Sequence, residues 1–261
     1  MVTVFPLASG SSGNSFYISA GEGRGGLLID AGISCRRIVT ALNDAGTDPA
    51  GLHGVLVTHD HIDHISGLRV LSKHLHLPVY GSAVTLEHIA PQMEPDAVLI
   101  PLEETAEIAS IGVTPFETQH DAEGSCGFRI EIGSRSIGFA TDLGTITPNV
   151  MQHLLGCHLV VLESNYDEHM LMACGYPYPL KQRIRSDYGH LGNAEAAETA
   201  AELVRRGTSR LVLAHLSRES NTPELALQTT RGRLLSDGML EERDYRLTVA
   251  QRDAPSVMIR F

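Results

Sequence analysis

Basic residues, cysteines and long apolar runs are all scarce in this chain. Its 20 Lys and Arg stand against 31 Asp and Glu, a formal net charge of −11, which argues against wrapping of duplex DNA by a broad basic face. The 4 cysteines form no Cys-x-x-Cys pair, which argues against a disulfide framework or a zinc knuckle and predicts reduced, buried thiols. No run reaches the length of a membrane span, and the first residues lack the pattern of a signal peptide. We therefore expect a cytoplasmic protein with no membrane partner.

No linker, repeat or low-complexity stretch divides the sequence. Its 261 residues, 43% of them hydrophobic, can bury a substantial core. We predict a single domain over residues 1–261.

The chemistry of the chain centres on residues 55–64, where an apolar run ends in the sequence THDHIDH. The pattern predicts a strand, a loop and then a helix over residues 65–74. In an extended or tightly looped backbone, side chains two apart leave on the same side, so His59 and His61 can converge on one cation. Asp63 and His64 follow at the turn into the helix and can face a second cation. Imidazole with carboxylate suits zinc, manganese, iron or cobalt rather than calcium or magnesium. The alternative to a metal site is a histidine-rich surface loop without a function.

THDHIDH resembles the signature of the metallo-β-lactamase superfamily, whose members are αββα sandwiches with one or two metals at one edge. The resemblance implies three further ligands in the order His, Asp, His, each at a strand end. His120, Asp142 and His215 follow strand-like runs in this order. Each residue alone would be read as a cap or a surface group, but their order agrees with the superfamily.

Segments along almost the whole chain resemble the YycJ-like (WalJ-like) branch of that superfamily: LASGSSGNS, THDHIDH, FATDLG, LESNYD, GHLGN and AHLSRESNTPEL. An α/β (α+β) fold is therefore expected, with two mixed β-sheets packed face to face and flanked by helices. The alternation of strands and helices agrees with it. One departure is Gly192, where that branch commonly has Ser.

By the family pattern, two divalent metal ions bind, with zinc or manganese favoured over iron. A water between two such ions loses its proton near neutral pH and becomes a bridging hydroxide nucleophile. Asp30, at the end of another predicted strand, is expected to support the metal loop without a catalytic part. The assigned metal ligands are His59, His61 and His120 for the first ion, Asp63, His64 and His215 for the second, and Asp142 as the bridge.

Catalysis is assigned to Asp63 and His190. His190 either fixes its own turn or protonates the leaving oxygen of a phosphodiester, and the likeness of GHLGN to the branch motif GHLSN favours the second role. The glycine and serine loop at residues 7–15 could hold an anion or be a flexible hairpin loop, and the branch has a similar loop beside its metal site. The residues assigned to substrate binding are Ser11, Ser12, Asn14 and Asn165.

Residues 175–185 combine tyrosine and proline with Lys181, Arg183 and Arg185. Bases stack on aromatic rings and phosphates pair with arginine, so this segment could contact a nucleic-acid strand. A solvated helix face explains it equally well. Further patterns predict a helix capped by Asn193 and a closing β-hairpin over residues 245–261.

The implied activity is metal-dependent phosphodiester hydrolysis by a 5′-to-3′ DNA exonuclease with a role in repair. The acidic net charge suits an enzyme that holds a strand end and grips few phosphates. The alternatives are a small-molecule hydrolase, either a cyclic phosphodiesterase or a thioesterase of the glyoxalase II type, and a mononuclear iron dioxygenase. Spacing alone sets neither polarity nor DNA over RNA, nor the oligomeric state.

Overall fold

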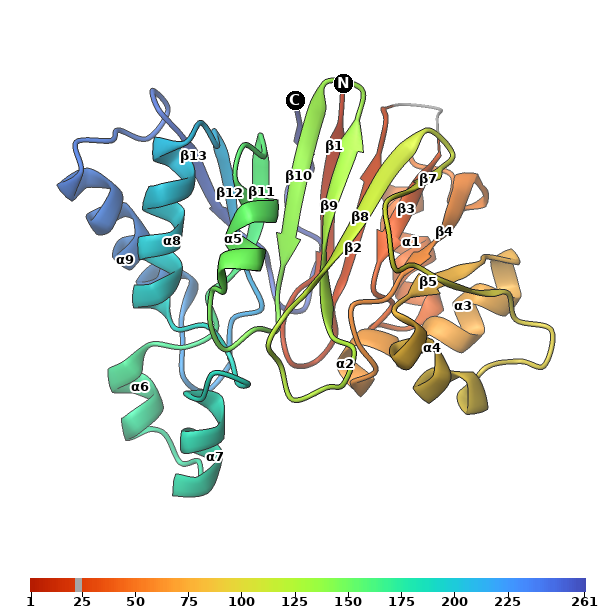
Figure 1. Ribbon diagram of the computed structural model, residues 1–261, viewed down its shortest axis with the longest axis horizontal. Coiled ribbons are helices and arrows are strands. Elements are labelled where there is room, and N and C mark those ends of the chain that lie inside the picture. Colours follow the sequence, from red (N-terminus) through yellow and green to blue (C-terminus); the bar gives the residue numbers. More distant parts are fainter. Residues whose placement is uncertain (22–24) are drawn as a thin grey trace.

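Two β-sheets pack face to face and helices cover their outer faces in the computed structural model, which describes residues 1–21 and 25–261 (Figure 1). In the first sheet the strand order is β14 (Ile259–Arg260), β1 (Thr3–Ala8), β2 (Ser15–Ser19), β3 (Gly26–Ile29), β4 (Leu52–Leu56), β5 (Val79–Gly81) and β6 (Leu99–Pro101). In the second sheet it is β13 (Arg246–Val249), β12 (Arg210–Ala214), β11 (Leu159–Glu163), β10 (Arg135–Ala140), β9 (Cys126–Ile132), β8 (Ile111–Glu117) and β7 (Ala106–Ile108).

Both sheets are mixed in the same way. Strands β3 to β6 run parallel to one another, as do β10 to β13, while β1 to β3 and β7 to β10 are antiparallel neighbours. The carboxyl ends of the parallel strands meet at one end of the sandwich, which is the lower end in Figure 1. Loops that follow these strands are therefore brought together there.

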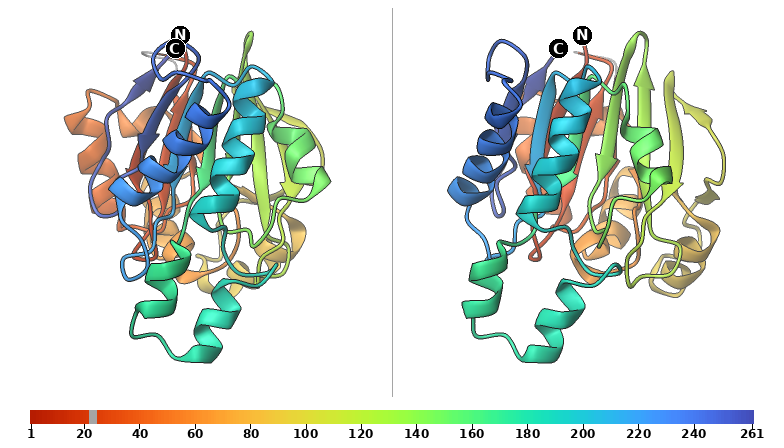
Figure 2. Two further views of the ribbon diagram at one scale, coloured as in Figure 1. Left: turned by 90° about the vertical axis from the view of Figure 1, so that its left-hand side faces the viewer. Right: turned by 60° about the vertical axis from the view of Figure 1, so that its left-hand side comes forward.

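Each sheet has its own helical cover. Helices α1 (Cys35–Asp44), α3 (Leu68–Leu75) and α4 (Ala83–Ile89) pack on the first sheet, with the short α2 (Ile62–Ile65) at its end. Helices α5 (Pro148–Leu154), α8 (Asn193–Arg205) and α9 (Pro223–Ser236) pack on the second. Helices α6 (Glu168–Ala173) and α7 (Tyr178–Ile184) project away from both sheets (Figure 2). Short 3₁₀ turns cover Pro49–Gly51 and Ala90–Gln92.

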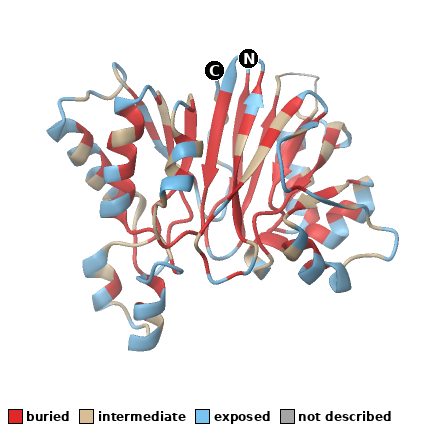
Figure 3. Ribbon diagram, in the orientation of Figure 1, coloured by how far each residue is buried: buried red, intermediate tan, exposed pale blue. Residues whose placement is uncertain are grey.

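The main core fills the space between the sheets (Figure 3). Side chains alternate along the strands, so Leu27 and Ile29 of β3 face this core while Leu28 packs under the helices. The rings of Phe16 and Phe139, from opposite sheets, meet edge to face with centroids 5.0 Å apart. Strands buried on both faces explain why the sequence shows continuous apolar runs rather than strict alternation. Within the described residues, no helix combines the length and apolarity that crossing a membrane requires.

The helix predicted over residues 65–74 is wrong in extent, because the chain forms α2 and α3 with a break at Ser66 and Gly67. The backbone N–H of Gly67 donates to the carbonyl of Ala31 at 2.8 Å. A Cβ at Gly67 would lie 2.0 Å from the carbonyl oxygen of Ile33. The close approach of this backbone to the segment after β3 bends the chain, and that contact is not encoded in helical periodicity.

Two further expectations are corrected. The closing hairpin is wrong, because β13 joins the second sheet beside β12 while β14 joins the first beside β1. Both strands extend a sheet edge that would otherwise be unpaired, so they separate instead of pairing with each other. Asn193 is not a cap: Gly192 precedes α8, and the Asn193 side chain bonds to Ser164 and Asn221.

Candidate metal centre

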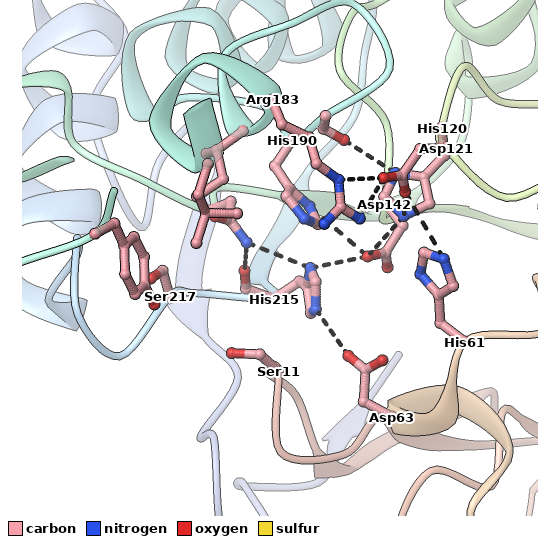
Figure 4. Close-up of a pocket in the computed structure, with 15 residues that line it drawn as sticks. Ser11, His61, Asp63, His120, Asp121, Asp142, Arg183, His190, His215 and Ser217 are labelled. Atoms are coloured by element: carbon pink, nitrogen blue, oxygen red, sulfur yellow. Dashed lines mark hydrogen bonds and ion pairs between the residues drawn. The ribbon is translucent and has the colours of Figure 1, made fainter. Parts of the chain in front are cut away.

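The seven predicted ligands lie at one end of the sandwich, in loops that follow strands and, for Asp63 and His64, on the short helix α2. His59 to His64 follow β4, His120 follows β8, Asp142 follows β10 and His215 follows β12 directly. Figure 4 shows His61, Asp63, His120, Asp142 and His215 turned toward a common space. The residues that the sequence spreads over more than half of its length are therefore brought together by strand order.

Two groups of donor atoms form, and they adjoin. The first donor group is His59, His61 and His120, whose ligand atoms lie within 4.8 Å of one another. The second donor group is Asp63, His64 and His215, whose ligand atoms lie equally close. Asp142 belongs to a group with His59 and His64 and to another with His215. This placement of Asp142 between the two sets is the arrangement that a bridging carboxylate needs.

Buried polar atoms without a hydrogen-bond partner show whether these residues fit a metal ion. The Nε2 atoms of His59, His120 and His215 and the Oδ2 atom of Asp142 are buried without a hydrogen bond to any described residue. Buried polar atoms are nearly always paired, so four unpaired atoms in one place need an explanation. Divalent cations bound by imidazole nitrogen and carboxylate oxygen would satisfy them.

Hydrogen bonds on the far side of the rings fix the imidazoles of the metal loop. The carboxylate of Asp30 accepts from the Thr58 N–H and hydroxyl, both at 2.9 Å, and lies 2.7 Å from His64 Nδ1. Because the single hydroxyl proton of Thr58 goes to Asp30, the Thr58 oxygen accepts from His59 Nδ1 at 3.0 Å. That tautomer leaves Nε2 of His59 with the lone pair that a metal requires. The predicted supporting role of Asp30 agrees with these contacts.

Backbone strain is concentrated at the same place. Asp30, Asp142 and His215 have positive φ values of 60°, 57° and 55°. Left-handed backbone costs a non-glycine residue about 1–3 kcal/mol and persists where surrounding contacts impose it. Here the N–H of His215 donates to the Ser9 hydroxyl and the N–H of Asp30 to the Leu56 carbonyl, both at 2.8 Å. At Asp142 and His215 this backbone conformation accompanies side chains that face the shared space, and at Asp30 it accompanies the side chain that supports His64 from behind.

Residues 26–216 match the family model of the beta-lactamase superfamily domain. The chain belongs to the metallo-β-lactamase superfamily. It is 34% identical over 243 residues to exodeoxyribonuclease YycJ of Bacillus anthracis, covering 92% of this chain and 89% of that protein. It is 32% identical over 229 residues to exodeoxyribonuclease WalJ of Streptococcus pneumoniae strain D39, covering 85% and 84%. The expected place in the YycJ-like branch of this superfamily is confirmed.

Two solved structures agree with this fold. YhfI from Bacillus subtilis matches with a TM-score of 0.73 at 16% identity, covering 98% of both chains. PqqB from Methylobacterium extorquens matches with a TM-score of 0.74 at 18% identity, covering 100% of both. The predicted αββα sandwich of two mixed sheets is confirmed.

Glu163 is a central residue of this site that sequence reasoning missed. Its Oε1 lies 2.8 Å from Nδ1 of both His190 and His215, while its Oε2 accepts from the N–H groups of Leu143 and Leu191 at 3.0 and 3.2 Å. Burial alone would raise the pKa of Glu163, but the charges and hydrogen bonds of the two histidines outweigh it and hold that pKa low. The available signal was a charged residue closing the apolar strand β11.

Asp121 is a second residue that the sequence did not single out. Its Oδ1 lies 3.3 Å from His120 Nε2 and 3.7 Å from His61 Nε2, and its Oδ2 pairs with the guanidinium of Arg183. Burial favours a higher pKa for Asp121, yet His120 and Arg183 lower it below its usual range. The first group of ligands therefore has a carboxylate beside it that is itself tied to α7.

Two of the four residues assigned to substrate binding line the cavity beside the candidate ligands, and the other two do not. Ser11 and Asn165 line a cavity of about 280 Å³ together with the candidate ligands and His190. Asn14 is buried, and its amide lies 3.0 Å from His64 Nε2 and 3.4 Å from Asp63 Oδ2, so it contacts the metal loop. The hydroxyl of Ser12 is exposed and donates to Asp253 at 2.8 Å, outside the lining of this cavity.

Proposed function

We propose that this chain is a metal-dependent phosphodiester hydrolase that degrades DNA from a strand end in the 5′-to-3′ direction. The observation that carries the proposal is the pair of adjoining donor groups with Asp142 between them. Two neighbouring cations suit phosphodiester cleavage because they can stabilise both the attacking and the leaving oxygen. The DNA substrate is supported by the relatives named exodeoxyribonuclease.

Two divalent ions, zinc or manganese, would be held by the seven residues that the sequence assigns. When bound, they would make a water acidic enough to attack phosphorus near neutral pH and would offset the negative charge of the phosphate. Burial would raise the pKa of Asp63, but the contact with His215 at 3.6 Å and the charge of His64 keep that pKa below its usual range. Asp63 is therefore a carboxylate at working pH.

His190 would act on the leaving group. Its Nδ1 faces Glu163 at 2.8 Å, so its other ring nitrogen is left for the cavity that His190 lines. The Glu163 carboxylate accepts a hydrogen bond from the Nδ1–H group and would stabilise the doubly protonated, positively charged ring. As the phosphorus–oxygen bond to the leaving group breaks, Nε2 would transfer its proton to the departing oxygen.

The proposal is tested with 5′-labelled and 3′-labelled oligonucleotides, single-stranded and duplex, in Mn²⁺ or Zn²⁺. A glutathione thioester and a cyclic phosphodiester serve as competing substrates. We expect release of mononucleotides from the 5′ end. Turnover of the thioester or the cyclic diester, with every oligonucleotide intact, would reject the nuclease proposal.

A matched pair of variants tests whether oligonucleotide cleavage depends on the donor groups. Asp63→Ala removes a carboxylate from the second donor group and is expected to abolish cleavage. Asp60→Ala removes a carboxylate from the same motif whose Oδ2 lies 3.0 Å from Nδ1 of His88. We expect Asp60→Ala to retain cleavage, because that side chain contacts α4 instead of the donor groups.

A further inference from the structure

Between β11 and α8 the chain leaves the sandwich and forms an arm, residues 167–189, that contains α6 and α7. The arm projects from the end of the molecule that carries the metal centre (Figures 1 and 2). Four of its side chains line the same cavity as the candidate ligands. They are Tyr176, Leu180, Arg183 and Ile184.

The helix α7 explains why three of these side chains share a direction. Leu180, Arg183 and Ile184 are spaced three and four residues apart, so they lie on one face of a helix. Tyr176 precedes that helix and is half-buried beside the same space. The arm therefore gives the cavity a wall with an aromatic ring and two aliphatic side chains.

A buried lysine of the arm stabilises the turn between α6 and α7. Lys181 is 8% exposed, and its ammonium donates to the carbonyls of Met172 and Cys174, both at 2.7 Å. These bonds span the turn between α6 and α7, the segment on which Tyr176 lies. Of the two interpretations left open for residues 175–185, contact with a nucleic-acid strand is not supported for Lys181, because its charge is used inside the arm.

Contacts at the root of the arm hold it against the metal centre. The carbonyl of Gly189 accepts from His120 Nδ1 at 3.0 Å. A Cβ on Gly144 would lie 2.3 Å from the backbone of Asp187, so the loop after β10 touches the arm directly. Arg183 pairs with Asp121 beside the first donor group. Tyr176 is therefore held at a defined place relative to the site of cleavage.

The charges of the arm are largely neutralised. Arg183 pairs with Asp121, and Arg185 lies 2.9 Å from Glu168. The arm accordingly offers a substrate an apolar and aromatic wall more than a cationic one, while the opposite side of the cavity carries the candidate ligands. A ligand that fits both sides has a flat apolar face joined to a phosphate, which is the chemistry of a nucleotide with an unpaired base.

Resting on the proposed nuclease function, we propose that Tyr176 stacks on the base of the nucleotide at the strand end. A cavity of about 280 Å³ lies at the lower limit of small-molecule sites, about 300–1,000 Å³. Its size suits a single terminal nucleotide, held between the arm and the donor groups. Stacking tolerates every base, which suits an exonuclease.

The test combines a variant with an altered substrate. Wild type, Tyr176→Ala and Tyr176→Phe are compared on a single-stranded oligonucleotide and on the same strand lacking its 5′-terminal base. Tyr178→Ala is the matched control, because Tyr178 lies on the same arm, is 65% exposed and is outside the cavity lining. Metal content and thermal melting are recorded for every protein.

We expect Tyr176→Ala to raise KM for the single strand by about 5- to 150-fold, the effect of losing one stacked base, with kcat and metal content retained. Removing the terminal base should cost wild type a similar factor and cost Tyr176→Ala little more. Tyr176→Phe and Tyr178→Ala should behave as wild type.

Two results overturn the inference alone: Tyr176→Ala cleaves the single strand as well as wild type, or the losses from the variant and from the abasic end simply multiply. Multiplying losses would mean that the ring supports the arm without touching the base. A wild-type protein that cleaves no oligonucleotide overturns the proposed function, and this inference with it.

Discussion

Replacing Glu163 by glutamine tests whether one buried carboxylate organises the metal centre. The carboxylate accepts from two imidazoles through Oε1 and from two backbone N–H groups through Oε2. Glutamine has the same shape but only one acceptor oxygen, and its amide nitrogen can only donate. Whichever way the amide is turned, its NH₂ group faces two donors. We expect Glu163→Gln to fold and to lose metal.

The size of the effect follows from those two mismatched donors. If the amide nitrogen faces Leu143 and Leu191, two buried N–H groups lose their partners, at about 1–3 kcal/mol each, and the free energy of unfolding falls by about 2–6 kcal/mol. If it faces His190 and His215, neither imidazole finds an acceptor for a proton on Nδ1, and a neutral His215 carries its proton on Nε2 instead. His215 then has no lone pair toward the second donor group. Changes of this kind in the supporting shell of a metal cost about 10- to 100-fold in affinity or activity.

Three measurements distinguish these outcomes: metal content after dialysis against a weak chelator, oligonucleotide cleavage, and urea unfolding of metal-free protein. Glu107→Gln on the exposed face of β7 is the control, and it should match wild type in all three. Wild-type metal retention, turnover and unfolding free energy in Glu163→Gln would refute the assignment of Glu163 as the residue that orients both histidines.

Further predictions concern the same structure. Asp142→Ala is expected to retain fewer than two equivalents of metal by elemental analysis, whereas His190→Ala retains both and loses most turnover; full activity of His190→Ala would remove its proposed role. Burial alone would lower the pKa of His64, but the charges of Asp142 and Asp30 raise it to about 9 in metal-free protein. This folded-state pKa exceeds the usual 6.5, so the stabilisation from His64 is present below pH 6.5 and is lost as pH rises to 9. Urea unfolding midpoints of metal-free protein should therefore fall over that interval. Metal affinity should rise over the same interval, because metal binding requires the deprotonated ring. Burial raises the pKa of the Cys126 thiol to about 12 and that of Cys157 to about 11, so neither should react with a thiol reagent at pH 8 until the protein is denatured.

Local signals in the sequence predict much of this fold. Ser34, Thr147 and Thr222 each precede a helix and accept a hydrogen bond from its first turn. The apolar runs before the candidate ligands form strands, because a fully buried strand must be apolar on both faces. The spacing within THDHIDH places its histidines in two neighbouring groups, since the loop after β4 is short and turns directly into α2.

What the sequence did not predict depends on contacts between distant segments. Glu163 meets His190 and His215, which are 27 and 52 residues away, and no local pattern connects them. Gly67 interrupts a helical pattern because another backbone lies against it. Lys181 looks like a surface cation in its own segment, yet the fold of the arm surrounds it with carbonyl groups. In each case one half of the interaction is absent from the neighbouring sequence.

The acidic composition and the nucleic-acid substrate that we propose are compatible because the two ends of a nucleotide are held differently. Phosphate contacts by arginine would need a basic surface, whereas Arg183 and Arg185 are already paired with carboxylates. Two cations at the donor groups would place about four positive charges at one point without altering the surface elsewhere. The base is then left to the aromatic wall of the arm, where stacking needs no charge. An enzyme of this kind would bind one nucleotide at a strand end and make few contacts with the rest of the DNA. A protein with a net charge of −11 can therefore act on a polyanion.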